Sequence, residues 1–223
     1  MSPLTLFHIV TGTIAVFSGA IALIAPKGKP LHRRAGKIFY FTMMAMAASG
    51  AVMGYIVSQA ITVVAGCFTG YLVTTSWDSV RRKYAKPGTW ELCTMFVGLI
   101  VGLTGVMFGF EALNSEAGLK DGFTPFPYFF MGGLALFATA LDASLFFRAP
   151  LSYKHKIARH LWRMCFAYFI AAGSLFTGPG AVAFPEAIRQ SGILDIPEPL
   201  ILLLMIFWLV RTLYKKPRKK ALA

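Results

Sequence analysis

Seven apolar runs, each close to the length that a helix needs to cross a lipid bilayer, dominate this sequence. A bilayer core about 30 Å thick requires roughly 20 apolar residues in a helix, because only internal hydrogen bonds satisfy the backbone there. Hydrophobic residues make up 57% of the chain and charged residues only 14%, unlike a soluble domain. We therefore expect an all-α, polytopic membrane helix bundle that forms a single integral membrane domain over residues 1–223. The seven expected transmembrane helices are Pro3 to Ala25, Lys37 to Val57, Ala60 to Asp78, Trp90 to Leu113, Tyr128 to Phe147, His160 to Phe184 and Pro199 to Leu213.

The basic residues divide the connections into two kinds. Four groups hold 20 of the 22 Lys and Arg residues and fall on alternate connections and on the C-terminal tail. Because Lys and Arg concentrate in cytoplasmic loops, the alternation predicts an odd number of helices, an external N-terminus and a cytoplasmic C-terminus. Each of these residues should also attract anionic headgroups by about 1 kcal/mol. The groups are Lys27, Lys29, Arg33, Arg34 and Lys37; Arg81, Arg82, Lys83 and Lys86; Arg148, Lys154, Lys156, Arg159 and Arg163; and Arg211, Lys215, Lys216, Arg218, Lys219 and Lys220.

The same distribution bears on partners. Nucleic acid is not expected despite the net charge of +13, since the basic residues stand between apolar runs and form no polar domain. Cys67, Cys93 and Cys165 lie in apolar segments without a CxxC spacing, which favours packed thiols. No basic residues precede the first apolar run, so we expect it to stay attached as a helix and not to be cleaved as a signal. The expected partner is the bilayer with anionic headgroups on its cytoplasmic side, and a homo-oligomer is left open.

Two histidine-containing basic stretches resemble each other, PKGKPLHRRAGKIF at residues 26–39 and SYKHKIARHLWRM at residues 152–164. In each, a basic residue follows a histidine directly and an alanine stands three positions after it. Both stretches open a helix that runs outward from the cytoplasmic side. Helices one to three and five to seven could therefore be two parallel repeats around helix four, a 3+1+3 plan used by some transporters. The alternative is that the two stretches share only the basic character of cytoplasmic loops.

Five residues that can bind metals or carry protons are expected in the inner third of the membrane. His32 and His160 begin helices on the cytoplasmic side, and His155 and Asp78 lie at the same surface. Asp142 should lie about 8 Å deeper, from its position five residues before the end of helix five. The histidines could also be solvated or contact lipid headgroups.

Asp142 is the strongest single candidate, because an ionised carboxylate within a membrane needs a partner and usually has a function. We expect it to face the bundle and to pair with Arg159, His160 or Arg163. The two arginines should keep His160 a neutral imidazole, suited to a metal ion, heme iron or a hydrogen bond. His8 lies one or two turns from the outer surface, where packing and functional roles are equally open.

The segments HIVTGTIAVFSGAIALIAPKGKPLHRRAGKIF and ARHLWRMCFAYFIA together resemble a bacterial family of multi-pass membrane proteins known as domain of unknown function 2306. The resemblance covers about a third of the chain and implies a location in the bacterial inner membrane, which is the plasma membrane. It implies no activity. The residues that match the family pattern are His8, Gly12, Lys27, Gly28, His32, Arg33, Gly36, His160 and Arg163.

A heme- or metal-binding redox protein is the function that these residues favour. Heme b requires two histidines at one depth on neighbouring helices, with arginines near its propionates. His32 and His160, flanked by Arg33 and Arg163, meet this requirement on the inner side, whereas His8 has no histidine partner on the outer side. A divalent metal held by His32, His160 and Asp142 is the other form of this hypothesis.

Three further classes of function stay open. A metal-dependent intramembrane hydrolase would use three ligands and a water molecule, but the sequence has no HExxH motif. A small-molecule transporter would use the repeats, a helix break at Gly178 to Gly180 and Asp142 for coupling. A structural or assembly protein would need none of these residues.

Overall fold

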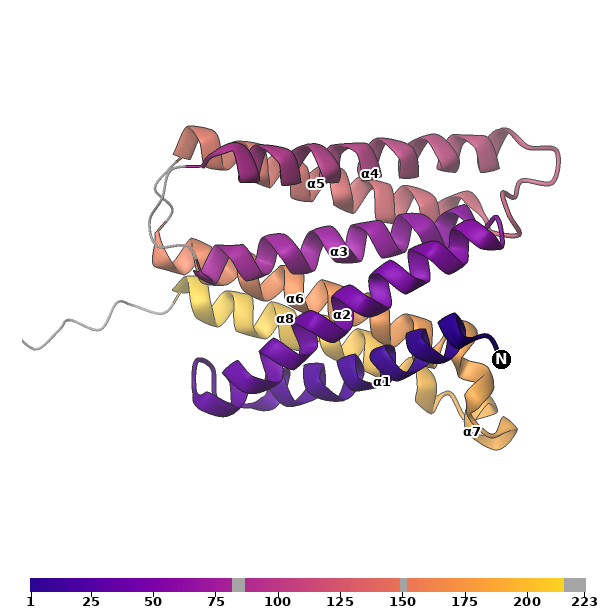
Figure 1. Cartoon of the computed structure of the whole chain (residues 1–223), viewed down its shortest axis with the longest axis horizontal. Coiled ribbons are helices and arrows are strands. Elements are labelled where there is room, and N and C mark those ends of the chain that lie inside the picture. The colour runs from indigo at the N-terminus through magenta and orange to yellow at the C-terminus, as the bar shows by residue number, and fades with distance from the viewer. Residues whose placement is uncertain (82–86, 149–151, 215–223) are drawn as a thin grey trace, which may run out of the picture.

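The structure is a bundle of long α-helices (Figure 1). It is a computed structural model that describes residues 1–81, 87–148 and 152–214. These ranges contain no β-strand, so the expectation of an all-α fold is confirmed. The long helices are α1 (Pro3–Ile24), α2 (Pro30–Ile56), α3 (Ala60–Arg81), α4 (Thr89–Asn114), α5 (Pro125–Arg148), α6 (Tyr153–Phe176) and α8 (Pro197–Tyr214), and the short elements η1 (Pro179–Ala183), α7 (Glu186–Gln190) and η2 (Ile193–Asp195) connect α6 to α8.

Within the described residues, six helical segments are long and apolar enough to cross a membrane. They are α1 to α5 and the segment Ile193–Tyr214, which contains α8. This supports the expectation of a multi-pass integral membrane protein. Helix α6 is not among the six, since its first half carries Lys154, Lys156, Arg159 and Arg163. The seventh span, the orientation and the 3+1+3 repeat stay predictions.

Two helix boundaries differ clearly from the sequence-based expectation. Helix α2 begins at Pro30 and not at Lys37, because proline is favoured in the first turn and outweighs the polarity of the residues that follow. Helix α6 begins at Tyr153 and not at His160, because the Ser152 hydroxyl accepts a hydrogen bond from a backbone N–H of the first turn. It ends at Phe176, before the Gly-Pro-Gly sequence of residues 178–180, which therefore terminates the helix and does not break it in the middle.

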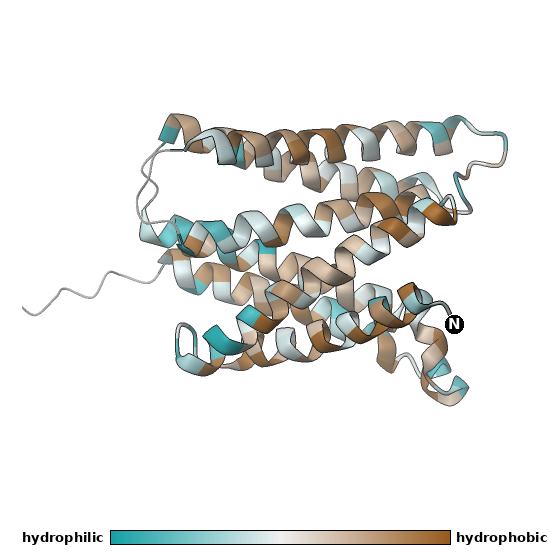
Figure 2. Cartoon of the chain, viewed as in Figure 1, coloured by the Kyte–Doolittle hydropathy of each residue, from teal (hydrophilic) through white to brown (hydrophobic). Residues whose placement is uncertain are grey.

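The helix ends that border the connections rich in basic residues lie at one end of the bundle (Figure 1). We call this the basic end: the α1–α2 turn, the end of α3, the start of α4, the end of α5, the start of α6 and the end of α8. Hydrophilic residues gather there at the start of α2, the start of α6 and the end of α3 (Figure 2). The other members of the expected basic groups lie outside the described residues, namely Arg82, Lys83, Lys86, Lys215, Lys216, Arg218, Lys219 and Lys220.

At the opposite end, two connections are fastened to each other. The α2–α3 turn is tight, with Ser58 in the left-handed region at φ 52°. The backbone N–H of Ala60, which begins α3, donates to the Asp121 carboxylate in the α4–α5 loop at 2.8 Å. In the same loop Lys120 pairs with Glu111 at 2.8 Å, and this hydrogen bond raises the pKa of the lysine. The α2–α3 and α4–α5 hairpins are therefore joined at this end by the hydrogen bond between Ala60 and Asp121.

The core of the bundle lies between α3 and α6. Phe68 and Leu72 of α3 are fully buried, as is Ala167 of α6, whereas much of the outer surface is apolar and exposed. Phe17 and Ile100, for example, are 68% and 62% exposed on α1 and α4. Such surfaces would be unfavourable in water and suit contact with lipid.

Helices α4 and α5 pack closely through glycines. A Cβ atom at Gly105 would lie 2.8 Å from the Cα of Gly132, and one at Gly132 would lie 2.7 Å from the backbone nitrogen of Val106. Gly102 and Gly109 also face α5, where a Cβ atom would meet Leu136 and Phe129 respectively. In a membrane the hydrophobic effect does not drive helices together. Their association depends on close van der Waals contact, which such stripes of small residues allow.

This contact predicts that Gly132→Ala destabilises the protein and Gly133→Ala does not. The added methyl at residue 132 would overlap backbone atoms of α4, which should lower the free energy of unfolding by about 1–3 kcal/mol. A Cβ atom added at the adjacent Gly133 would meet nothing within 4 Å, which makes this residue a matched control on the same helix. Thermal unfolding in detergent, followed by circular dichroism, measures both. Equal midpoints would contradict close packing of α4 on α5.

Candidate functional site

Helix α6 carries two different polar faces at the basic end. Arg159 and Arg163 are four residues apart and therefore lie on one face of the helix, toward α5. His160 lies on another face and contacts α3. Each face makes a separate set of hydrogen bonds.

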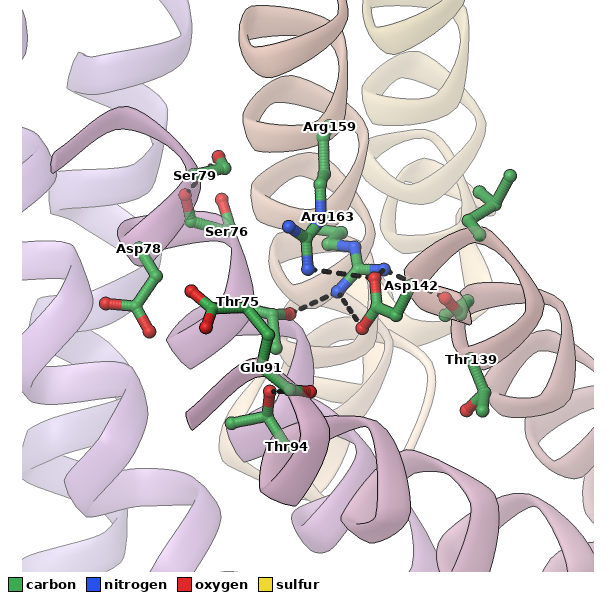
Figure 3. A network of polar contacts seen from close by, with 12 residues as sticks. Thr75, Ser76, Asp78, Ser79, Glu91, Thr94, Thr139, Asp142, Arg159 and Arg163 are labelled. Carbon is green, nitrogen blue, oxygen red and sulfur yellow. Dashed lines mark hydrogen bonds and ion pairs between the residues drawn. The ribbon is translucent and has the colours of Figure 1, made fainter. Parts of the chain in front are cut away.

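The arginine face forms a network around Asp142 of α5 (Figure 3). Arg159 Nη2 donates to Asp142 Oδ1 at 2.8 Å, and Arg163 Nη2 donates to the same oxygen at 2.5 Å. Asp142 Oδ2 accepts from Tyr71 Oη at 2.5 Å and from Arg163 Nη1 at 3.2 Å. Arg163 also donates to Thr75 Oγ1 and to a backbone carbonyl of α5. The network thus joins α3, α5 and α6.

The expectation that Asp142 faces the bundle and pairs with a cation from the start of α6 is therefore confirmed. The side chain of Arg163 is fully buried and Asp142 is only 2% exposed. Two guanidinium groups surround one carboxylate, so this buried group of three side chains carries an excess positive charge when all are ionised. The Nε atoms of both arginines are buried without a hydrogen-bond partner among the described residues.

This geometry corrects two groupings expected from the sequence. Both terminal nitrogens of Arg163 are engaged by Asp142, Thr75 and α5, so this residue does not stand beside His32 as a propionate clamp. A metal site made of His32, His160 and Asp142 is also not formed. No three His, Cys, Asp or Glu side chains come together to hold a metal ion in residues 1–81, 87–148 and 152–214.

The His160 ring is oriented by Ser76 of α3. Ser76 Oγ donates its hydrogen to the backbone carbonyl of His160 at 2.8 Å. His160 Nδ1 lies 3.0 Å from the same Oγ and 3.3 Å from the Ser76 carbonyl oxygen. Because both of these oxygens can only accept at this point, Nδ1 carries the ring hydrogen and donates it. This leaves Nε2 as the unprotonated nitrogen of the neutral ring.

The His32 ring is oriented by the C-terminal end of α1. Its Nδ1 lies 2.9 Å from the carbonyl oxygen of Ala22, an acceptor only, so Nδ1–H donates here too. Lys27 Nζ donates to the carbonyl groups of Ala22 and Leu23, and Gly28 adopts φ 77° in the turn between the helices. Lys27, Gly28 and His32 of the first basic stretch therefore all help to cap α1.

The Nε2 atoms of His32 and His160 stay available. Within the described part of the chain nothing hydrogen-bonds to either atom. Both histidines are half-buried, and both lie at the basic end.

The remaining candidates lie apart from this pair of histidines. His8 Nδ1 lies 3.1 Å from Ser49 Oγ, and Ser49 is about 25 Å along α2 from His32 at 1.5 Å per residue. His155 is exposed and contacts its own helix cap, Ser152, at 2.7 Å. Asp78 accepts a hydrogen bond from the Trp90 indole. Exposed Arg33 follows His32 directly in α2.

Comparison with protein-family models, curated proteins and solved structures finds no match for this chain. The resemblance to the bacterial membrane family stays a prediction.

The network around Asp142 predicts a strong loss of stability in Asp142→Asn. The substitution leaves two buried guanidinium groups without a counter-charge, and breaking a buried ion pair in this way costs about 3–5 kcal/mol. Tyr71→Phe removes one neutral donor to the same carboxylate and should cost only about 1 kcal/mol. Unfolding of both variants in detergent gives the comparison. An Asp142→Asn variant no less stable than Tyr71→Phe would mean that the carboxylate is not the centre of the network.

Proposed function

We propose that α1 to α6 and α8 all cross a bacterial inner membrane, with the N-terminus outside and the C-terminus in the cytoplasm. The basic end would then be cytoplasmic, as the distribution of Lys and Arg favours. Helix α6 has the length for a seventh span, at 24 residues or about 36 Å. Its deepest charge, Arg163, is paired inside the bundle with Asp142 and does not face lipid. That pairing reduces the cost that would otherwise exclude the helix from a membrane.

Reporter fusions test this topology. A fusion of alkaline phosphatase after Lys120 or after Gln190 should be active, since both positions would lie outside. Green fluorescent protein after Ala223 should fluoresce, since this position would be cytoplasmic. An inactive phosphatase after Gln190, together with a non-fluorescent green fluorescent protein after Ala223, would mean that α8 crosses the bilayer and α6 does not.

For function, we propose a heme- or metal-binding, redox-related membrane protein whose inner-side ligands are His32 and His160. The observation that carries this proposal is that both imidazoles lie at the basic end, each held by an Nδ1–H hydrogen bond and each with an Nε2 that has no hydrogen-bond partner among the described residues. Ligand histidines commonly donate their second N–H to a carbonyl or similar acceptor, which fixes the ring and raises its basicity. Two such rings suit heme b or a divalent metal with further ligands from outside the chain.

Each part of the chain around these histidines would have a definite task. Ala22 and Ser76 hold the two rings in orientation through the hydrogen bonds to Nδ1. Arg33 supplies positive charge beside His32 for an anionic group such as a heme propionate. Bound heme would supply one-electron chemistry. The Asp142 network would keep α3 and α6 in register, so that His160 keeps its position.

Absorption spectra and metal analysis of the purified protein test the redox proposal. Wild type should carry heme or a stoichiometric metal, and His32→Ala and His160→Ala should each lose it. His8→Ala is the matched control, since its ring has a similar serine contact but lies toward the other end of α2. Full retention of the bound species in both inner variants would remove the heme and metal proposals together.

A small-molecule transporter with two three-helix repeats is the alternative that one observation favours. The excess positive charge buried around Asp142 is suited to binding an anion or to coupling with a proton. A transporter should lose uptake in a conservative variant, Arg159→Lys, whose fold is intact. If neither cofactor nor transport is found, the histidines and the arginines have a structural or assembly role.

A further inference from the structure

A groove opens between α2 and α3 at the basic end, apart from both the histidines and Asp142. It has a volume of about 400 Å³ and is lined by Lys37, Phe41, Trp77 and Arg81. Two of its lining side chains are cationic and two are aromatic, and none is acidic. Lys27, Arg159 and Arg163 at the same end instead bond to carbonyl groups or to Asp142.

The aromatic wall of the groove is held in place by its neighbours. The Trp77 ring stacks on Tyr40 with the centroids 4.5 Å apart and the planes inclined by 24°. The Arg81 guanidinium lies 5.5 Å from the centroid of Trp77. Because Tyr40 and Trp77 come from α2 and α3, the stacked pair fixes the width of the groove at this level.

The two cations of the groove have no anionic partner among the described residues. The side chains of Lys37 and Arg81 form no hydrogen bond or ion pair within these residues, and both are exposed. Lys37 lies seven residues into α2, about 10 Å from its start. If the basic end is cytoplasmic, both cations lie at the level of the lipid headgroups, where an unpaired cation attracts anionic lipid.

The outer rim of the groove faces the surface that lipid would cover. Phe41 is 65% exposed, one turn beyond Lys37 along α2. A soluble anion would need only the cations, whereas a phospholipid would also use the exposed aromatic side chain next to them. Aromatic rings are favoured at the boundary between headgroups and acyl chains.

We propose that this groove binds the headgroup of one anionic phospholipid. Its phosphate contacts Lys37 and Arg81, and its glycerol and upper acyl carbons lie against Phe41 and Trp77. The proposal rests on the proposed membrane topology but not on the histidine pair, so the lipid and the cofactor are tested independently.

Native mass spectrometry of the detergent-purified chain, titrated with phosphatidylglycerol or phosphatidylcholine, tests the proposal. Wild type should bind one phosphatidylglycerol in preference to phosphatidylcholine. The double variant Lys37→Gln/Arg81→Gln should bind it roughly 30-fold more weakly, as expected for the loss of two basic residues at an anionic surface. The matched control is Lys29→Gln/Arg34→Gln, which removes two exposed charges near the same end of α2 but none from the groove, and should weaken binding much less.

Further variants distinguish a specific lipid site from general attraction to charge and from a site for a soluble anion. Phe41→Ala retains both cations and should weaken phosphatidylglycerol binding while leaving any competition by inorganic phosphate unchanged. Equal weakening in the two double variants would show attraction to overall charge and overturn the proposal. Displacement of the lipid by an equal concentration of inorganic phosphate, with no effect of Phe41→Ala, would identify a soluble-anion site and also overturn it. Size-exclusion profiles and circular dichroism establish that each variant is folded.

Discussion

The ion-pair network of Asp142 with Arg159 and Arg163 is the interaction on which the arrangement of the central helices depends. It joins α5 to α6 and, through Tyr71 and Thr75, to α3 (Figure 3). A charge in a membrane must be paired or reach water. Here the partners come from three different helices, so only one relative placement of these helices satisfies the carboxylate. The network therefore specifies packing as well as contributing to stability.

The placement of Arg163 and Asp142 has a consequence for His160. With both arginines turned toward α5, the next face of α6 is free to place the imidazole against α3, where Ser76 orients it. The polar residues at the basic end are thus separated into a closed charged network and a more open pair of histidines. In the first, both oxygens of Asp142 and both terminal nitrogens of Arg163 are bonded. The second leaves two ring nitrogens available, which is the chemical basis of the cofactor proposal.

Sequence periodicity and charge predicted the long helices well but placed some ends incorrectly. The start of α2 was expected at Lys37 because polar residues precede it, yet Pro30 begins the helix seven residues earlier. Asp142 was correctly expected to pair with the start of α6, since an intramembrane carboxylate needs a cation. The glycine stripe on α4 was overlooked, although its spacing of three and four residues, from Gly98 to Gly109, is a recognised signal for close helix packing.

The amino-acid sequence by itself determined that this chain is helical, apolar enough for a bilayer and basic at alternate connections. These properties follow from composition and order, because length and hydrophobicity decide whether a segment suits a bilayer. Only the tertiary structure decided which polar groups meet. Arg163 and His160 are three residues apart in sequence and both reach α3, but only Arg163 also bonds Asp142 of α5, whereas His160 bonds Ser76. Asp142 was therefore separated from the histidines with which it had been grouped, since depth in the membrane does not specify the face of a helix.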